Sequence, residues 1–142
     1  MRTRASAAFV VALLVASCGR AEGLAAASPE TFDVTVLSVT DGDTFRATDR
    51  SMPPVRVWGI DAPEIETRAG TEASDWLRRR IEGKRLRCAP KDVDRYGRLV
   101  AACVLDGEDI AAALIANGHA VEWCRYSDGY YGQCRQGGRS KP

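Results

Sequence analysis

Residues 56–64 read RVWGIDAPE, and this stretch constrains the fold and the chemistry more than any other part of the 142-residue chain. It begins with Arg56, continues through an apolar run, and ends in two carboxylates, Asp61 and Glu64, with Pro63 between them. Proline fixes its own φ and disfavours the helical region for the residue before it. Both acidic side chains therefore extend from a constrained backbone at the end of a predicted strand.

Two short motifs elsewhere in the chain add to this signal. Residues 41–44 read DGDT, and residues 94–98 read DRYGR. Taken alone, each is typical of a tight turn, because aspartate and glycine supply the backbone angles that turns need. Taken together with residues 56–64, they offer carboxylates suited to a hard cation, a further carboxylate for a water molecule, and two arginines for a phosphate.

In this order, the three motifs resemble those of the staphylococcal nuclease (thermonuclease) family, and the resemblance extends over residues 34–121. It implies a mainly β fold with helices, built on the five-stranded barrel of the OB class. It also implies a calcium-dependent nuclease that hydrolyses DNA and RNA with little sequence specificity and leaves 3′-phosphate ends. The alternatives are a catalytically inactive OB-fold protein that binds nucleic acid, and an exported structural lipoprotein.

The resemblance implies a site for Ca²⁺. Asp43 and Asp61 match the family's carboxylate ligands, and the backbone carbonyl of Ala62 is expected to add a third protein oxygen. A small number of protein ligands leaves room for water and a substrate phosphate around a hard cation. Asp41 is expected to support the turn rather than to bind the metal.

The resemblance assigns roles to four other residues. Glu64 matches the family's catalytic glutamate, which orients or deprotonates the attacking water. Arg56 and Arg98 match two arginines that contact the phosphate, where each planar fork can pair with two oxygens. Tyr96 is expected to pack near the nucleotide, whereas His119 matches no catalytic position.

Hydrophobic periodicity predicts the secondary structure of a nuclease domain over residues 32–125. Helices are predicted at residues 70–83, capped by Thr71, and at residues 109–116. Residues 126–142 contain abundant helix breakers and are predicted to form an irregular basic tail in place of the family's third helix. Strands are predicted at residues 32–39, 44–48, 55–60, 84–89 and 99–105.

The N-terminal residues are predicted to be an export signal. Residues 1–17 combine a short positive segment with an apolar run that is too short for a stable membrane anchor. The VASC sequence that ends at Cys18 resembles the lipobox of bacterial lipoproteins, so Cys18 is the candidate acylated residue and residues 18–31 form a linker. We therefore expect an exported protein, anchored to a membrane outside the cytoplasm. Ordinary signal peptidase cleavage within residues 23–28 is the alternative and would give a periplasmic or secreted protein.

An oxidising compartment permits disulfides between the remaining four cysteines, for which three connectivities exist. Cys88 and Cys103 flank the turn at residues 94–97 symmetrically, so they face one another if the flanking segments pair as a hairpin. Cys124 and Cys134 would then close a short C-terminal loop. A zinc site is the weaker alternative, because the sequence has no Cys-x-x-Cys pair and a single histidine.

The balance of charge excludes a broadly basic nucleic-acid-binding protein. The chain has 20 Lys and Arg residues and 19 Asp and Glu residues. Two of the cations belong to the export signal, so 18 of the 20 remain in the mature chain against 19 anions. A polyanion must therefore be held locally, by a metal and a few arginines, rather than by the overall field.

We expect the protein to be a monomer.

Overall fold

The computed structural model describes residues 30–134. The predicted export signal, Cys18 and almost all of the linker lie outside this range, as do residues 135–142 of the predicted tail. None of the helices in the described part is long and apolar enough to cross a membrane. The elements are, in order, β1 (Phe32–Asp41), β2 (Thr44–Ala47), β3 (Val55–Val57), β4 (Ile60–Asp61), α1 (Arg68–Ile81), β5 (Arg85–Val93), β6 (Leu99–Leu105), β7 (Glu108–Asp109), α2 (Ile110–Ala116), β8 (Val121–Glu122) and α3 (Cys124–Ser127).

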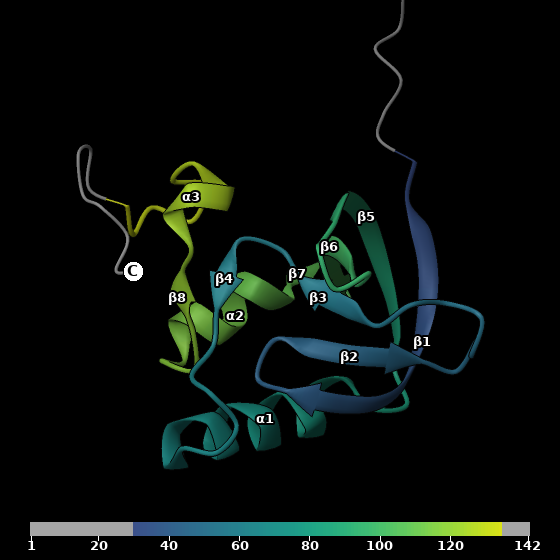
Figure 1. The fold of residues 1–142 in the computed structure, drawn as a ribbon, viewed down its shortest axis with the longest axis horizontal. Coiled ribbons are helices and arrows are strands. Elements are labelled where there is room, and N and C mark those ends of the chain that lie inside the picture. The colour runs from purple at the N-terminus through teal and green to yellow at the C-terminus, as the bar shows by residue number, and fades with distance from the viewer. Residues whose placement is uncertain (1–29, 135–142) are drawn as a thin grey trace, which may run out of the picture.

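Five of the strands form a closed barrel. The sheet order is β3-β2-β1-β5-β6, and β3 also pairs with β6 in parallel, which closes the barrel. The two-residue strand β7 extends the sheet beyond β6, while β4 and β8 pair separately. Figure 1 shows α1 and α2 outside the barrel and the β4–β8 ribbon beside it. The five-stranded OB-type barrel predicted from the sequence is therefore confirmed.

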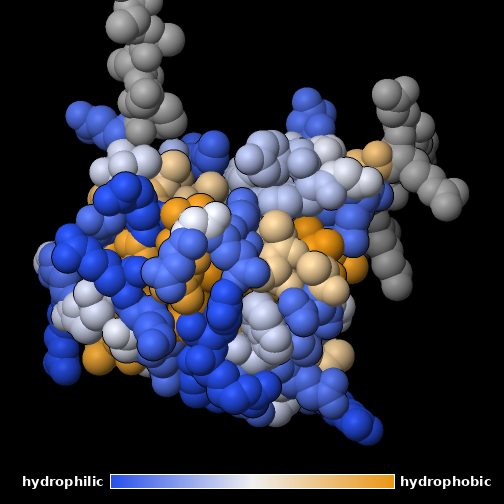
Figure 2. Space-filling model, turned by 180° about the vertical axis from the view of Figure 1, so that it is seen from behind, coloured by the Kyte–Doolittle hydropathy of each residue, from blue (hydrophilic) through white to orange (hydrophobic). Residues whose placement is uncertain are grey.

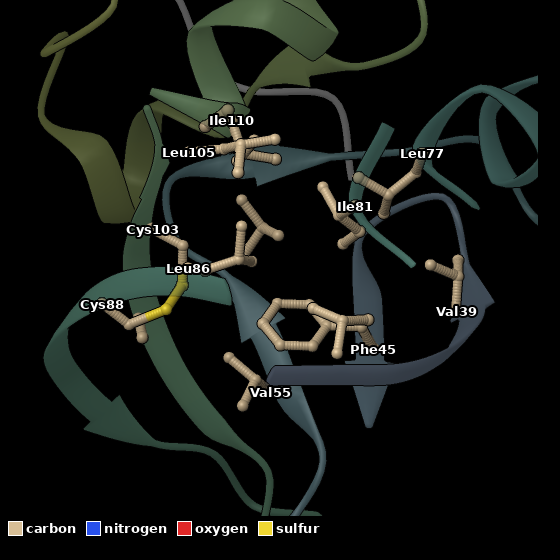
Figure 3. Packing of buried hydrophobic residues seen from close by; sticks show 14 of the residues in the cluster. Val39, Phe45, Val55, Leu77, Ile81, Leu86, Cys88, Cys103, Leu105 and Ile110 are labelled. Atoms are coloured by element: carbon tan, nitrogen blue, oxygen red, sulfur yellow. A yellow bond between two sulfur atoms is a disulfide. The ribbon is translucent and has the colours of Figure 1, made fainter. Parts of the chain in front are cut away.

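The core fills the barrel and the space between its strands and helices. Fully buried Phe45 of β2, Val55 of β3 and Leu86 of β5 lie in the same cluster as Leu77 and Ile81 of α1 (Figure 3). Burying apolar surface of this kind is the main favourable contribution to folding. The disulfide Cys88–Cys103 joins β5 to β6 inside this core, and both cysteines are buried.

The predicted strand at residues 55–60 is in fact two strands. Trp58 and Gly59 form a turn between β3 and β4, and Gly59 has a φ of +79°, which other residues rarely adopt. A Cβ at Gly59 would also lie 2.9 Å from the Tyr131 ring. The strand prediction was wrong here because an apolar run does not reveal a turn that depends on distant packing.

The N-terminus of α1 also differs from the prediction. The helix begins at Arg68, and its capping residue is Thr67 rather than Thr71, since the Thr67 side chain accepts a hydrogen bond from the backbone N–H of Gly70. Both threonines satisfy the sequence preference for a cap. The choice between them depends on contacts with the preceding loop, which sequence alone does not show.

The remaining boundaries follow the pairing of strands. β5 continues to Val93, beyond the predicted end at residue 89, because its ladder with β6 runs as far as the Val93–Leu99 pair. The turn at residues 94–98 therefore lies at the tip of a long hairpin. α2 ends where predicted, at Ala116, but begins one residue later than predicted, because Asp109 is its capping residue.

The C-terminal segment is more ordered than predicted. Residues 124–127 form the one-turn helix α3, and the disulfide Cys124–Cys134 closes the loop that follows. The prediction of an irregular tail from residue 126 was therefore wrong at its start, although α3 is the only helix that follows β8 within the described residues. Both disulfides have the connectivity expected from the sequence.

A buried carboxylate organises this C-terminal segment. Glu122 accepts hydrogen bonds from the hydroxyl of Ser127 (2.6 Å), the backbone N–H of Tyr131 (2.8 Å) and the backbone N–H of Gln133 (2.7 Å). Burial raises the pKa of Glu122, but these hydrogen bonds outweigh it and hold the pKa below its usual value. The segment is thus held together by an ionised side chain as well as by a disulfide.

Candidate active site

Three connections bring the sequence motifs to one cleft. These connections are the β1–β2 turn, the loop from β4 to α1, and the β5–β6 turn, and Arg56 of β3 projects between them. The cleft has a volume of about 270 Å³ and is lined by Asp41, Gly42, Asp43, Arg56, Asp61, Ala62, Pro63, Glu64, Ile65, Tyr96 and Arg98. The structure therefore brings together every metal-binding, catalytic and substrate-binding residue that the sequence motifs suggested.

Asp43 is the buried centre of the cleft. Its Oδ1 accepts hydrogen bonds from Arg56 (2.8 Å) and from the Thr44 hydroxyl (3.0 Å), and its Oδ2 accepts one from the backbone N–H of Ala62 (3.2 Å). Asp41 supports the turn, as its side chain accepts a hydrogen bond from the Asp43 N–H (3.1 Å). Burial raises the pKa of Asp43 to about 6, although the positive charge of Arg56 acts in the opposite direction.

These oxygens fit a hard cation. The buried Asp43 carboxylate is incompletely compensated, and a divalent cation beside it would favour the ionised form. Asp61 lies at the other side of the same cleft, where 60% of its side chain is exposed, 3.6 Å from Arg56. Carboxylate and carbonyl oxygens are the ligands that Ca²⁺ prefers. The donor set of Asp43, Asp61 and the Ala62 carbonyl is therefore chemically suited to the ion that the sequence resemblance implies.

The cysteines do not offer a competing metal site. Within residues 30–134, the one group of three His, Cys, Asp or Glu side chains whose ligand atoms lie within 4.8 Å of one another is Glu122, Cys124 and Cys134. The two sulfurs of this group are joined in a disulfide, and the carboxylate is engaged by three hydrogen bonds. The zinc alternative is therefore not supported in this part of the chain.

The two arginines enter the cleft from strand β3 and from the β5–β6 turn, and they are linked through Thr44 and Asp43. Arg98 donates a hydrogen bond to Asp94 (2.7 Å) and another to the Thr44 hydroxyl (3.3 Å), which itself donates to Asp43. Burial alone would raise the pKa of Asp94, but its hydrogen bonds with Arg98 hold the pKa below its usual value. Sequence reasoning missed the roles of Thr44 and Asp94, although both belong to the quoted motifs.

The loop that carries Glu64 is fixed through its backbone. The Glu64 carbonyl accepts hydrogen bonds from the N–H (2.9 Å) and hydroxyl (2.7 Å) of Thr67, the residue that caps α1. Gly70 of α1 packs so closely that a Cβ there would collide with the same carbonyl. The exposed Glu64 side chain thus extends into the cleft from an anchored main chain.

A second groove, of about 410 Å³, adjoins the cleft and shares Arg56, Tyr96 and Arg98 with it. Its lining also includes Trp123 and Arg125, from a segment that none of the sequence motifs covers. The Arg56 guanidinium carbon lies 5.2 Å from the centroid of the Trp123 ring. Sequence reasoning missed Trp123, because it becomes a neighbour of Arg56 only through the pairing of β4 with β8.

His119 has a structural environment. Its ring packs against Trp76 of α1, with 5.3 Å between ring centroids, and it is absent from the lining of the cleft. The absence of a catalytic role for His119 stays a prediction. The arginines at residues 78–80 are also remote from the cleft lining, and Arg78 pairs with Asp75 on the surface of α1.

The fold and the cleft define an OB-type barrel with an acidic site flanked by two arginines. Residues 54–137, more than half of the chain, match the family described as "Staphylococcal nuclease homologue". The chain therefore belongs to the staphylococcal nuclease family.

Individual relatives agree with this assignment. The chain is 30% identical over 121 residues to an "Uncharacterized endonuclease" of Haemophilus influenzae, covering 83% of this chain and 68% of that one. It is 36% identical over 72 residues to the "Probable staphylococcal-like nuclease CAN1" of Oryza sativa subsp. japonica, covering 51% of this chain. It spans only 22% of the length of that plant protein. A further relative, 32% identical over 115 residues, is the "Succinoglycan biosynthesis protein ExoI" of Rhizobium meliloti.

Proposed function

We propose that the protein is a calcium-dependent nuclease that hydrolyses the phosphodiester bonds of DNA and RNA with little sequence specificity. The observation that carries this proposal is that one cleft contains two candidate metal ligands, the exposed Glu64 and two arginines. The names of the endonuclease and nuclease relatives support the same reaction class. A passive nucleic-acid-binding barrel would gain nothing from carboxylates that face a phosphate.

The metal would be held by Asp43, Asp61 and the backbone carbonyl of Ala62. When bound, Ca²⁺ supplies positive charge that offsets the negative charge developing on the phosphate oxygens. It would also replace Arg56 as a partner of the two carboxylates, which would leave the guanidinium available for the substrate. Because burial raises the pKa of Asp43, a nearby cation would stabilise the ionised form of this carboxylate.

The protein side chains account for the remaining steps. Arg56 and Arg98 hold the phosphate oxygens, with geometry that a lysine cannot reproduce. Glu64 orients a water molecule and accepts its proton as the water oxygen bonds to phosphorus. The bond from phosphorus to the 5′ oxygen breaks, the leaving oxygen takes a proton from solvent, and the product carries a 3′ phosphate.

Substrate selection follows from the same contacts. Groups that bind phosphate position a nucleic acid but carry no information about its bases. The nearly neutral chain has no strong overall attraction for polyanions. Binding should therefore depend mainly on the cleft, its metal and the neighbouring groove, and DNA and RNA should both be accepted.

The decisive experiment measures the release of acid-soluble nucleotides from single-stranded DNA by the purified protein. We expect release in millimolar calcium, no release after chelation, and loss of release in Glu64→Gln. The matched control is Glu66→Gln, because Glu66 is also exposed in the same loop but is absent from the cleft lining. Intact DNA in the presence of calcium would refute the proposal and would favour an inactive nucleic-acid-binding or structural protein.

A further inference from the structure

The C-terminal loop, defined here as residues 121–134, contacts an arginine of the candidate active site. The Trp123 ring lies 5.2 Å from the Arg56 guanidinium. We propose that Trp123 is a positioning residue that holds Arg56 in the orientation required for phosphate binding. The proposal rests on the nuclease function proposed above, which makes Arg56 a catalytic residue.

The backbone places Trp123 next to the turn that follows β3, the strand that carries Arg56. β8 pairs with β4, with Ile60 opposite Glu122 and Asp61 opposite Val121 (Figure 1). The ladder is extended by a hydrogen bond from the Trp123 N–H to the Gly59 carbonyl (2.8 Å). The indole is therefore attached to the same short ribbon that delivers Asp61 to the cleft.

The indole and the oxygen ligands use different parts of the guanidinium. Arg56 donates hydrogen bonds to Asp43 and to the carbonyl of Ile60 (3.3 Å), and such donors lie in the guanidinium plane. An aromatic ring attracts a cation through its face and consumes no N–H group. Trp123 can therefore remain in place while Arg56 exchanges a carboxylate partner for a phosphate.

The burial of Arg56 strengthens this contact. Only 13% of the Arg56 side chain is exposed, and a contact between a cation and an aromatic ring is stronger where water is excluded. Without the indole, the guanidinium would be held only by Asp43, Ile60 and Asp61. Two of these partners are the carboxylates that we assign to the metal, so a bound cation would compete with Arg56 for their oxygens.

The loop itself is held firmly enough to act as a support. The Trp123 ring packs edge-on against Tyr126, with 4.4 Å between ring centroids. Glu122, the neighbour of Trp123, accepts three hydrogen bonds from within the loop, and the Cys124–Cys134 disulfide closes it. These contacts fix the shape of the loop, and the hydrogen bond from the Trp123 N–H to the Gly59 carbonyl attaches it to the turn between β3 and β4.

The kinetic test compares Trp123→Leu with Trp123→Phe and with the control Tyr130→Leu. Tyr130 is an exposed aromatic residue of the same loop that packs against Trp58 and Tyr131 instead of Arg56. Trp123→Leu should lower kcat by about tenfold with little change in KM, because a cation–aromatic contact of a partly desolvated arginine is of that size. Trp123→Phe should recover most of the loss, and Tyr130→Leu should resemble the wild type.

A second readout does not depend on nuclease activity. In the calcium-free, substrate-free protein, the Nε–H resonance of Arg56, assigned with Arg56→Lys, should move downfield in Trp123→Leu as the shielding ring is lost. Trp123→Phe should give an intermediate shift, so the test survives if the leucine variant fails to fold. Tyr130→Leu should leave the resonance in place.

The two readouts separate the possible failures. If the wild-type protein cleaves no DNA but its Arg56 resonance responds to substitution of Trp123, the nuclease function is refuted and the contact between Trp123 and Arg56 is supported. An active wild type with an unchanged resonance and unchanged kcat in the Trp123 variants would refute the positioning role. A fall in kcat of equal size in Tyr130→Leu would also refute it, since any disturbance of the loop would then suffice.

Discussion

At the scale of single residues, the candidate site depends on the planar fork of Arg56. Its guanidinium reaches Asp43, Asp61 and the Ile60 carbonyl at once, which an ammonium group cannot do. We expect Arg56→Lys to lower kcat by about 10²–10³-fold, the usual consequence of removing one preorganised donor to the transition state. The change retains the charge beside Asp43, so the folded structure should persist. Calcium-dependent DNA hydrolysis and circular dichroism measure the two effects.

The matched control for this arginine is Arg79→Lys. Arg79 lies on the exposed face of α1, outside the lining of the cleft. Its substitution should leave kcat unchanged. A rate for Arg56→Lys within a few-fold of the wild type would contradict the assigned role.

Glu122 gives a prediction about pH at the same scale. Its pKa is lower in the folded protein than in the unfolded chain, because its hydrogen bonds outweigh the effect of burial. Its contribution to stability is therefore complete above the unfolded pKa and is lost as the pH falls through the folded pKa. In Glu122→Gln, an amide N–H₂ group replaces one acceptor, so we expect a loss of about 1–3 kcal/mol in the free energy of unfolding at neutral pH. In denaturant titrations, the free energies of unfolding of the wild type and of Glu122→Gln should become more similar below about pH 4.

At the scale of elements, much of the barrel could be predicted. Alternating residues in β1 and at the start of β5, and the apolar run of β6, predict strands, and the motif turns are encoded by aspartate and glycine. The cleft residues were found because each belongs to one of three sequence motifs with a recognisable composition. The division between β3 and β4 was not found, because Gly59 packs against Tyr131, which lies far along the chain. The cap of α1 was not found, because two threonines offer the same local signal and only the folded loop shows that Thr67 bonds the Glu64 carbonyl.

The contact between α1 and the Glu64 loop makes an element-scale prediction. Gly70→Ala would bring a Cβ against the carbonyl of Glu64, so the loop must shift. Overpacking of this kind typically costs about 1–3 kcal/mol. We expect a lower melting temperature and, below that temperature, a reduced kcat because Glu64 is displaced. The control Ala69→Gly changes an exposed neighbour in the same turn and should lower stability with kcat unaffected. A melting temperature of Gly70→Ala equal to that of the wild type would contradict this prediction, because the loop would then shift at little cost in free energy.

At the scale of the whole molecule, the C-terminal segment shows where prediction from sequence ended. Its glycines and turn residues correctly indicated a departure from a long helix. Its order comes instead from Glu122, which joins residues up to 11 positions apart, and from the Tyr131 side chain packed at Gly59. A tertiary network of this kind leaves no local periodicity. The contact between Trp123 of this segment and Arg56 of the candidate site therefore could not be predicted from the sequence.

Hydrophilic residues cover much of one face of the described domain. The face opposite to that of Figure 1 has small hydrophobic areas separated by hydrophilic residues (Figure 2). The sequence offers Cys18, which lies outside the described range, as a site of membrane attachment. We propose that the protein is exported and then acylated at Cys18. The two disulfides fit export, since such bonds persist in oxidising compartments.

Labelled fatty acid tests this location. We expect label in the wild type and none in Cys18→Ser, because the lipobox thiol is the acylated group. The variant should leave the membrane fraction and retain its nuclease activity, since the described domain begins after this residue. Soluble, unlabelled wild-type protein whose first residue lies within residues 26–28 would instead establish ordinary signal cleavage. That result would refute lipid attachment but leave the nuclease proposal intact, because the cleft and its ligands belong entirely to residues 41–98.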